Sequence, residues 1–379
     1  MNELTMPHTP KLSSLMVSTS YPVDLGDWRG LFIRHLSDAL ARRSDLAVRL
    51  WAPPGQAHPN ILSATSTHES TWLSQLMRDG GIAHILRNGG INRFSAPLKL
   101  LNMLRQAYFR NEDVDFYHIN WLQNALPVPD NGKPLLVTVL GTDMQLLKLP
   151  MMKNLLRRKF RQHPTTICPN AEWMVGPLNS AFGAVAKIQY IPFGIDSSWF
   201  KLKRQHVPTD VPMWIVVTRL TKGKLGPLFE WCEPLFHGNS RELHIFGPMQ
   251  EQIDIPDWVH YHGPASPEQL EKLWFRRAKG LITLSKHAEG RPQVMLEAMA
   301  AGLPILASRL PAHENIVFDG KTGWICDAKE QFSANLEQLE STENNLHFGQ
   351  SARTWVAWEI GTWDDCAARY NATYREITS

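Results

Sequence analysis

The sequence predicts an α/β protein built from two doubly wound domains. Short apolar stretches typical of buried strands alternate with helical patterns in both halves of the chain, as at Leu15 to Ser18, Leu135 to Leu140 and Met213 to Val217. At 379 residues the chain is long enough for two domains that each bury a core. The most informative segment is residues 280–302, which has the pattern of a strand, a loop and a helix.

The segment 280–302 predicts a ligand-binding edge of a sheet. Leu281 to Leu284 is a short apolar run after a glycine, Ser285 to Arg291 is loop-like, and Pro292 to Ala301 has a helical pattern. Gly302 suits the position just past a helix end. The loop therefore follows the carboxyl end of a strand, where open α/β sheets bind ligands.

Two glutamates of this segment are candidate binding residues. The helix from Val294 to Ala301 is apolar on every side except Glu297, and a helix that is apolar all round is normally buried. Glu297 would reach back toward Glu289 and the helix amides, which together suit a ligand with phosphate and hydroxyl groups. The alternative is that Glu297 lies on the solvent-exposed face of a surface helix and that Glu289 is a loop residue without a binding role.

The spacing of these glutamates resembles a known family signature. Glu289 and Glu297 are eight residues apart, within a stretch that continues to Gly302-Leu303-Pro304. This pattern is similar to the E-x7-E motif of family 4 retaining glycosyltransferases. The resemblance implies the GT-B fold, in which two Rossmann-like domains face each other across a cleft. Arg291-Pro292 stand where the family commonly has Phe-Gly, which bears on the identity of the sugar.

The resemblance also implies the domain organisation. Residues 1–197 would form an acceptor-binding domain that is completed by a C-terminal helix at 360–379, and residues 198–359 would bind the nucleotide-sugar donor. The aromatic spacing from Trp355 to Tyr374 predicts one helix that crosses back to the first domain. Lys201 to Pro212 is expected to be a basic linker.

Basic residues after the strand at 213–217 suit a diphosphate. Arg219 and Lys224 match the family's cations, and Lys222 is the rival for the lysine role. A leaving nucleoside diphosphate gains negative charge, which cations stabilise. The alternative is a solvated basic turn.

The family comparison suggests two sets of site residues. The catalytic set is Glu289, Arg219, Lys224 and His118. The donor-binding set shares Arg219, Lys224 and Glu289 with the catalytic set and further contains Gly26, Gly247, Gly263, Gly290, Arg291, Pro292, Gln293, Val294 and Glu297.

His118 is included in the catalytic set because many family members have a histidine where this chain has Leu140. We expect either that His118 reaches the reacting sugar from a neighbouring strand or that it is a structural histidine.

Composition excludes several other classes of protein. The 39 basic and 36 acidic residues nearly balance, so the chain lacks the strong positive potential that is typical of nucleic-acid-binding proteins. The four cysteines are scattered, which suits a reducing cytosol. The first fourteen residues lack a signal-peptide core, and no apolar run is long enough to span a bilayer, so a cytoplasmic location is expected. The Asp113-Val114-Asp115 pair is a poor metal cage, and we expect no metal or other cofactor.

The predicted function is transfer of a hexosyl unit, with retention of configuration, from a UDP- or GDP-sugar to a glycan or lipid-linked acceptor in bacterial cell-surface polysaccharide synthesis. A basic helix at 151–161 could place the protein on the inner face of a membrane, or it could be an ordinary solvated helix. The rivals are a GT-B sugar-nucleotide epimerase or hydrolase and a non-catalytic glycan-binding subunit. A nicotinamide dehydrogenase is the weakest rival, because no G-x-G-x-x-G fingerprint occurs.

Overall fold

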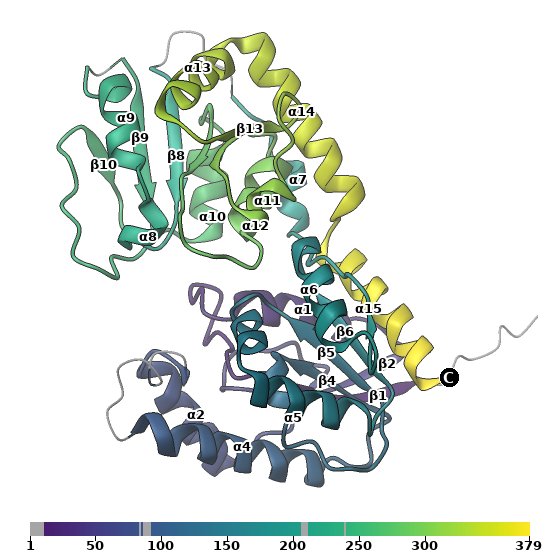
Figure 1. Ribbon diagram of the computed structural model, residues 1–379. Helices are drawn as coiled ribbons and strands as arrows, with labels where there is room; N and C mark the ends of the chain where they lie inside the picture. The colour runs from purple at the N-terminus through teal and green to yellow at the C-terminus, as the bar shows by residue number, and fades with distance from the viewer. Residues whose placement is uncertain (1–10, 83–84, 86–91, 206–210, 239) are drawn as a thin grey trace, which may run out of the picture. The chain divides into compact units, whose positions relative to one another are not determined.

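The computed structural model describes residues 11–82, 85, 92–205, 211–238 and 240–379. The chain divides into two compact units (Figure 1), Met1–Phe193 with Trp363–Ser379, and Gly194–Thr362. Each unit holds a parallel sheet with helices on both faces, so the predicted doubly wound α/β class is confirmed. The unit boundaries follow Phe193 and Thr362, a few residues from the positions 197 and 359 that the sequence suggested.

The sheet of the first unit has, among the described residues, seven strands in the order β3-β2-β1-β4-β5-β6-β7. All neighbouring pairs are parallel, and the chain order reverses at β1. The strands are β1 (Leu12–Val17), β2 (Leu46–Trp51), β3 (Ile61–Ser63), β4 (Phe116–Asn120), β5 (Leu135–Val139), β6 (Thr165–Pro169) and β7 (Lys187–Ile188).

Helices cover both faces of this first sheet. One face packs against α1 and α15, and the other against α2, α4, α5 and α6. These helices are α1 (Leu31–Ala41), α2 (Thr67–Arg78), α4 (Asn92–Arg110), α5 (Pro150–Phe160), α6 (Val175–Phe182) and α15 (Trp363–Thr378), and short 3-10 turns are η1 (Leu122–Ala125), η2 (Thr142–Lys148) and η3 (Glu172–Met174). The C-terminal helix α15 therefore belongs to the core of the first unit.

The C-terminal tail is two helices, so the prediction of one helix from Trp355 to Tyr374 is wrong. Helix α14 (Thr342–Glu359) belongs to the second unit, and α15 begins at Trp363. Gly361 between them has φ 69°, a left-handed conformation that ends a helix. Trp358 was expected on the aromatic face but is 84% exposed on α14.

The sheet of the second unit has six parallel strands in its described part, in the order β10-β9-β8-β11-β12-β13. The central strand β8 lies between β9 and β11, and the order of the strands reverses there. The strands are β8 (Met213–Val217), β9 (Glu242–Phe246), β10 (Val259–Tyr261), β11 (Gly280–Thr283), β12 (Ile305–Ser308) and β13 (Gly323–Cys326).

The second sheet is also covered on both faces. Residues of α7, η4, α11 and α14 form one core cluster, and residues of α9 and α13 with part of α14 form the other. The remaining bounds are α7 (Ser197–Lys201), α8 (Lys222–Leu225), α9 (Leu228–Phe236), α10 (Pro267–Gln269), the π-helix η4 (Leu270–Phe275), α11 (Gln293–Ala300), α12 (Pro311–Glu314) and α13 (Lys329–Glu340).

The predicted linker, Lys201 to Pro212, is partly built into the second unit. Arg204 donates hydrogen bonds to the carbonyl oxygens of Gly302 and Ala278, at 2.8 Å and 2.7 Å. Residues 206–210 of this segment lie outside the described residues. Among the described helices, none is both long and apolar enough to cross a membrane.

Candidate functional site

The predicted donor-site residues of the second unit follow the carboxyl ends of its strands. Arg219 and Lys224 come after β8, and Glu289 comes after β11. β8 and β11 are neighbours at the point where the strand order reverses. Open α/β sheets bind ligands at such a switch point, because the loops there diverge to opposite faces and leave a crevice.

Backbone contacts join the loops that follow β8 and β11. The Lys286 amide donates to the Gly223 carbonyl oxygen at 2.8 Å. Gly226 has φ 55°, and a Cβ at this position would lie 2.0 Å from the carbonyl oxygen of Leu284. Only glycine allows this approach, so Gly226 is a positioning residue that the sequence analysis missed.

An ion pair links the two loops. Lys224 Nζ lies 2.6 Å from Glu289 Oε1, and the two side chains are only 12% and 13% exposed. Burial lowers the pKa of Lys224; Glu289 opposes this shift, and the charge of Arg219 adds to it. The two predicted cations are therefore close enough to repel each other, as expected for groups that receive a polyanion.

Lys224, rather than Lys222, faces the site. Lys222 is exposed, and its backbone amide donates to Glu251 at 2.8 Å. The hydroxyl of Thr221 caps α8 by accepting a hydrogen bond from the Lys224 amide. Leu225, which replaces the glycine expected after the lysine, is buried in the core.

Glu297 is partly buried on α11, whose buried residues are all apolar. Burial, followed by the negative charge of Asp196, raises the pKa of Glu297 to about 7. Within the described part of the chain, no hydrogen bond or ion pair engages its carboxyl group. A carboxylate that is held this way, at an energetic cost to the fold, is a candidate for binding ligand hydroxyls.

The first turn of α11 lies against the segment that opens the second unit. Gln293 donates from Nε2 to the Gly194 carbonyl oxygen at 2.6 Å. Pro292 occupies the N-cap position rather than the predicted first helical position, with φ −72° and ψ 101°. The amides of the first turn, including that of Val294, have no partner inside the helix and can bind an anion. Gly290 and Arg291 precede this turn and are partly exposed.

Gly247 and Gly263 bring the ends of three strands together. The Gly247 amide donates to the Gly263 carbonyl oxygen at 2.9 Å, and the Tyr261 hydroxyl donates to the Gly247 carbonyl oxygen at 2.9 Å. A Cβ at Gly247 would lie 1.7 Å from the Thr218 carbonyl oxygen, next to Arg219. The structure thus places both glycines at the same sheet edge as Arg219.

Gly26 belongs to the first unit. It is exposed in the loop between β1 and α1, and its amide donates to Asp24 Oδ1 at 2.8 Å. This contact forms a local turn. The structure neither brings Gly26 together with the other predicted donor residues nor excludes it from them.

The surroundings of His118 favour the structural alternative over the predicted catalytic role. His118 is fully buried in the first unit, with Nε2 2.8 Å from the Thr138 hydroxyl and Nδ1 2.7 Å from the Tyr374 hydroxyl. Its ring also stacks on Tyr370. Burial lowers the pKa of His118 to about 3. Nδ1 holds α15 against the sheet and Nε2 links β4 to Thr138 of β5, which is a structural arrangement.

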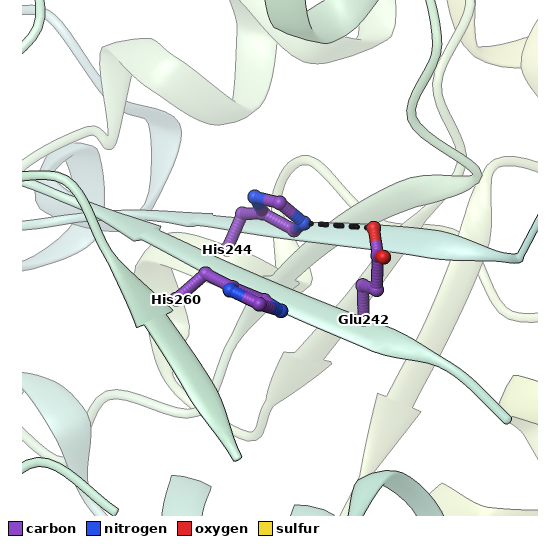
Figure 2. A group of neighbouring side chains, drawn as sticks. All are labelled: Glu242, His244 and His260. Atoms are coloured by element: carbon purple, nitrogen blue, oxygen red, sulfur yellow. Dashed lines mark hydrogen bonds and ion pairs between the residues drawn. The ribbon is translucent and has the colours of Figure 1, made fainter. Parts of the chain in front are cut away.

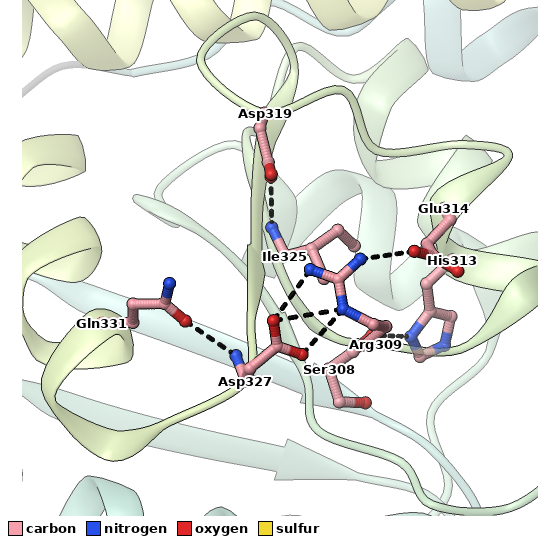
Figure 3. Close-up of polar contacts among 8 residues, drawn as sticks. All are labelled: Ser308, Arg309, His313, Glu314, Asp319, Ile325, Asp327 and Gln331. Atoms are coloured by element: carbon pink, nitrogen blue, oxygen red, sulfur yellow. Dashed lines mark hydrogen bonds and ion pairs between the residues drawn. The ribbon is translucent and has the colours of Figure 1, made fainter.

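His313 is a neighbour of the ion pair that the sequence analysis missed. It lies on α12 and is fully buried; its Nδ1 donates to the Ser308 carbonyl oxygen at 2.8 Å (Figure 3). Burial lowers its pKa, and the charges of Glu289 and Lys224 act on it with opposite signs. Its buried Nε2 has no hydrogen-bond partner among the described residues, so this nitrogen could accept a proton from a ligand hydroxyl.

An arginine-centred network fixes the neighbouring strand ends. Arg309, just after β12, pairs with Asp327 at 2.8 Å and with Glu314 of α12 (Figure 3). The Ser308 hydroxyl donates to the Ser285 carbonyl oxygen at 2.6 Å. The loops after β11, β12 and β13 are thereby connected, which holds His313 in place.

Comparison with known proteins agrees with this geometry. The family described as glycosyl transferases group 1 matches residues 237–355. A GDP-mannose-dependent alpha-(1-6)-phosphatidylinositol monomannoside mannosyltransferase of Mycobacterium tuberculosis is 22% identical over 264 residues, which cover 62% of this chain and 68% of the relative.

Two solved structures share the fold. Sucrose-phosphate synthase from Thermosynechococcus elongatus has a TM-score of 0.72 at 15% identity, covering 97% of this chain and 99% of its own. Anabaena HepE in complex with UDP and glucose has a TM-score of 0.62 at 14% identity, covering 96% of this chain and 99% of its own. The match over residues 237–355 and these relatives support the resemblance to family 4 glycosyltransferases, and the predicted GT-B fold is confirmed.

Proposed function

We propose that this glycosyltransferase moves a hexosyl unit from a UDP- or GDP-sugar to a glycan or lipid-linked acceptor, with retention of anomeric configuration and without a metal. The observation that carries the proposal is the partly buried Lys224–Glu289 pair at the switch point of the second sheet, with Arg219 close to it. The HepE structure with UDP and glucose supports a nucleotide-sugar donor. The mycobacterial relative supports a GDP-sugar and a lipid acceptor as alternatives within this class.

The second unit would hold the donor. Arg219 and Lys224 bind the diphosphate, because a guanidinium fork and an ammonium group both suit phosphate oxygens. Glu297 accepts hydrogen bonds from the ribose hydroxyls. Glu289 and the backbone from Gly290 to Val294 bind the transferred sugar, next to the amides that begin α11.

The same cations would stabilise the transition state. Negative charge grows on the leaving diphosphate as the glycosidic bond breaks, so cations fixed beside it lower the barrier. The ion pair with Glu289 already fixes Lys224 before substrate arrives. We propose a front-face route in which the leaving phosphate helps to deprotonate the acceptor hydroxyl. The other route to retention, double displacement, needs a carboxylate nucleophile, and we assign none in the first domain. Turnover that persists in excess chelator would support metal independence.

The acceptor would bind to the first unit, and α5 offers a contact to a membrane surface. Met151 and Leu155 on this helix are 76% and 47% exposed, and Arg158 and Arg161 are exposed near them. Exposed apolar and basic residues on one helix suit an anionic lipid surface. A lipid-linked acceptor in cell-surface polysaccharide synthesis would be reached from such a surface.

A donor panel tests the proposal. Thermal unfolding is measured with UDP-, GDP-, ADP- and dTDP-sugars; a true donor at a hundred times its dissociation constant adds about 2.7 kcal/mol of stability. We expect one UDP- or GDP-sugar to raise the melting temperature and Glu297→Gln to remove most of that shift. No shift with any sugar nucleotide would contradict the proposal.

Turnover assays then separate the related functions. An epimerase or hydrolase acts on the donor without an acceptor, whereas a transferase needs one. Donor binding without turnover, with or without a range of acceptors, would indicate a non-catalytic subunit. The assay includes this last outcome because Leu140, which directly follows β5, stands where the sequence resemblance implies a histidine.

A further inference from the structure

A cluster of imidazoles and a carboxylate lies on one face of the second sheet, on the strands β9 and β10 that precede Gly247 and Gly263. Glu242 and His244 are two residues apart on β9, so their side chains point to the same face of the sheet. His260 lies directly opposite His244 on the parallel neighbour β10. Figure 2 shows the three side chains on the same face, with the carboxylate of Glu242 directed at the His244 ring. One ligand-type atom from each residue lies within 4.8 Å of the other two.

Two of these atoms already have the spacing of metal ligands. His244 Nε2 and Glu242 Oε2 are 3.1 Å apart. Ligand atoms about 2.0–2.1 Å from a shared tetrahedral ion are roughly 3.3 Å from each other. A metal ion could therefore replace the proton between them with little movement of either side chain.

The third residue needs only a side-chain rotation. The rings of His260 and His244 are stacked, with centroids 4.7 Å apart and an angle of 25° between their planes. His260 is exposed and can turn its ring nitrogen toward the shared position. Glu242 has a side chain that is 43% exposed, so the site stays open to solvent for ion entry and for a water ligand.

The surroundings hold His244 in the orientation that a metal ligand needs. His244 is buried, and its Nδ1 lies 2.9 Å from Nε2 of His262. Trp274 packs against His244 and His262, with ring centroids 5.2 Å and 4.6 Å away. When Nε2 binds a metal, Nδ1–H can donate to Nε2 of His262, and an outer hydrogen bond of this kind fixes the orientation of a ligating histidine.

We propose that Glu242, His244 and His260 form a binding site for a divalent transition-metal ion of the Zn²⁺ class. Two imidazoles, one carboxylate and an open fourth position are a donor set that such ions bind. The site bridges β9 to β10, and β10 is the edge strand of the sheet. The ion would therefore fasten an edge strand that has a single neighbour, and it would act on the stability of the second unit rather than on sugar transfer.

Zinc titration of the full chain, after removal of metal with chelator, tests this site. We expect saturable binding of one Zn²⁺ per chain by calorimetry and a rise in melting temperature on saturation. His260→Ala and Glu242→Gln should each weaken Zn²⁺ binding at least tenfold and abolish the thermal shift. The matched control is His237→Ala, which removes an exposed histidine of the same unit outside the cluster and should bind within twofold of wild type.

A second probe reports on the ligands directly. Co²⁺ at the site should give visible absorption bands of a four- or five-coordinate ion, and these bands should be lost in His260→Ala. Since His260 is exposed, its substitution should leave the fold intact, and Glu242→Gln is the second variant should it not. Absence of one-to-one binding overturns the proposal. Binding that both variants leave unchanged means an adventitious ion only and overturns it equally.

Discussion

Replacing Glu297 by glutamine should stabilise the protein in alkaline solution and weaken donor binding at the same time. Burial and the charge of Asp196 raise the pKa of Glu297 from 4.5 to about 7. An acid whose pKa is raised in the folded state costs stability once the unfolded chain ionises. The cost is absent below pH 4.5, grows between pH 4.5 and 7, and is complete above pH 7.

The size of the effect follows from the shift. The pKa of Glu297 rises by about 2.5 between the unfolded and the folded protein, which corresponds to about 3 kcal/mol at about 1.4 kcal/mol per pKa unit. This figure is an upper bound, because Glu297 is partly exposed and solvent screens part of the cost. Glutamine keeps the shape and removes the charge, so Glu297→Gln should gain up to about 3 kcal/mol at pH 8 and almost nothing at pH 4.5.

Urea unfolding at pH 4.5 and pH 8, followed by tryptophan fluorescence, measures this difference. Glu233→Gln, at an exposed position on α9, is the matched control and should change stability little at either pH value. Calorimetry with the donor should show at least tenfold weaker binding for Glu297→Gln. A Glu297→Gln protein that is less stable than wild type at pH 8, or that binds donor normally, would refute the assignment of this carboxylate.

Three further predictions concern the cations, the buried histidine and the basic helix. Arg219→Ala and Lys224→Ala should each lower kcat/KM by about 30- to 1,000-fold, equivalent to about 2–4 kcal/mol of transition-state stabilisation, in steady-state assays. His118→Phe should lower the free energy of unfolding by about 1–3 kcal/mol in urea titrations, because the buried Tyr374 hydroxyl loses its partner and the Thr138 hydroxyl keeps only Tyr370, while kcat of the folded enzyme stays unchanged. Arg158→Glu with Arg161→Glu should reduce co-sedimentation with anionic vesicles and leave transfer to a water-soluble acceptor intact; equal sedimentation would remove the membrane contact from the account.

The fold could be predicted because its signals are local. Apolar runs identified strands within one or two residues, as for β5 and β8. The strand β3 was missed because it is short and mostly exposed, with Leu62 60% exposed. The break before α15 was missed because Gly361 interrupts an aromatic spacing that otherwise fits one helix.

The candidate site could be predicted only where a motif spans it. The eight-residue spacing of Glu289 and Glu297 identifies both as candidates, and Lys224 lies on a loop that the same family pattern covers. The sequence left two roles open for His118, because its partner Tyr374 is 256 residues away in the chain. His313 reaches the ion pair through loop packing, which no local pattern encodes.

Binding of the free nucleoside diphosphate is the most direct test of the central claim, that the switch point of the second sheet holds the diphosphate of a nucleotide sugar. Calorimetric titrations of UDP and GDP into wild type and into Lys224→Met compare binding with and without the ammonium group that faces Glu289. We predict that one nucleotide binds wild type and that Lys224→Met weakens its binding at least tenfold. Equal affinity for the two proteins, or no binding of either nucleotide to wild type, would contradict the claim.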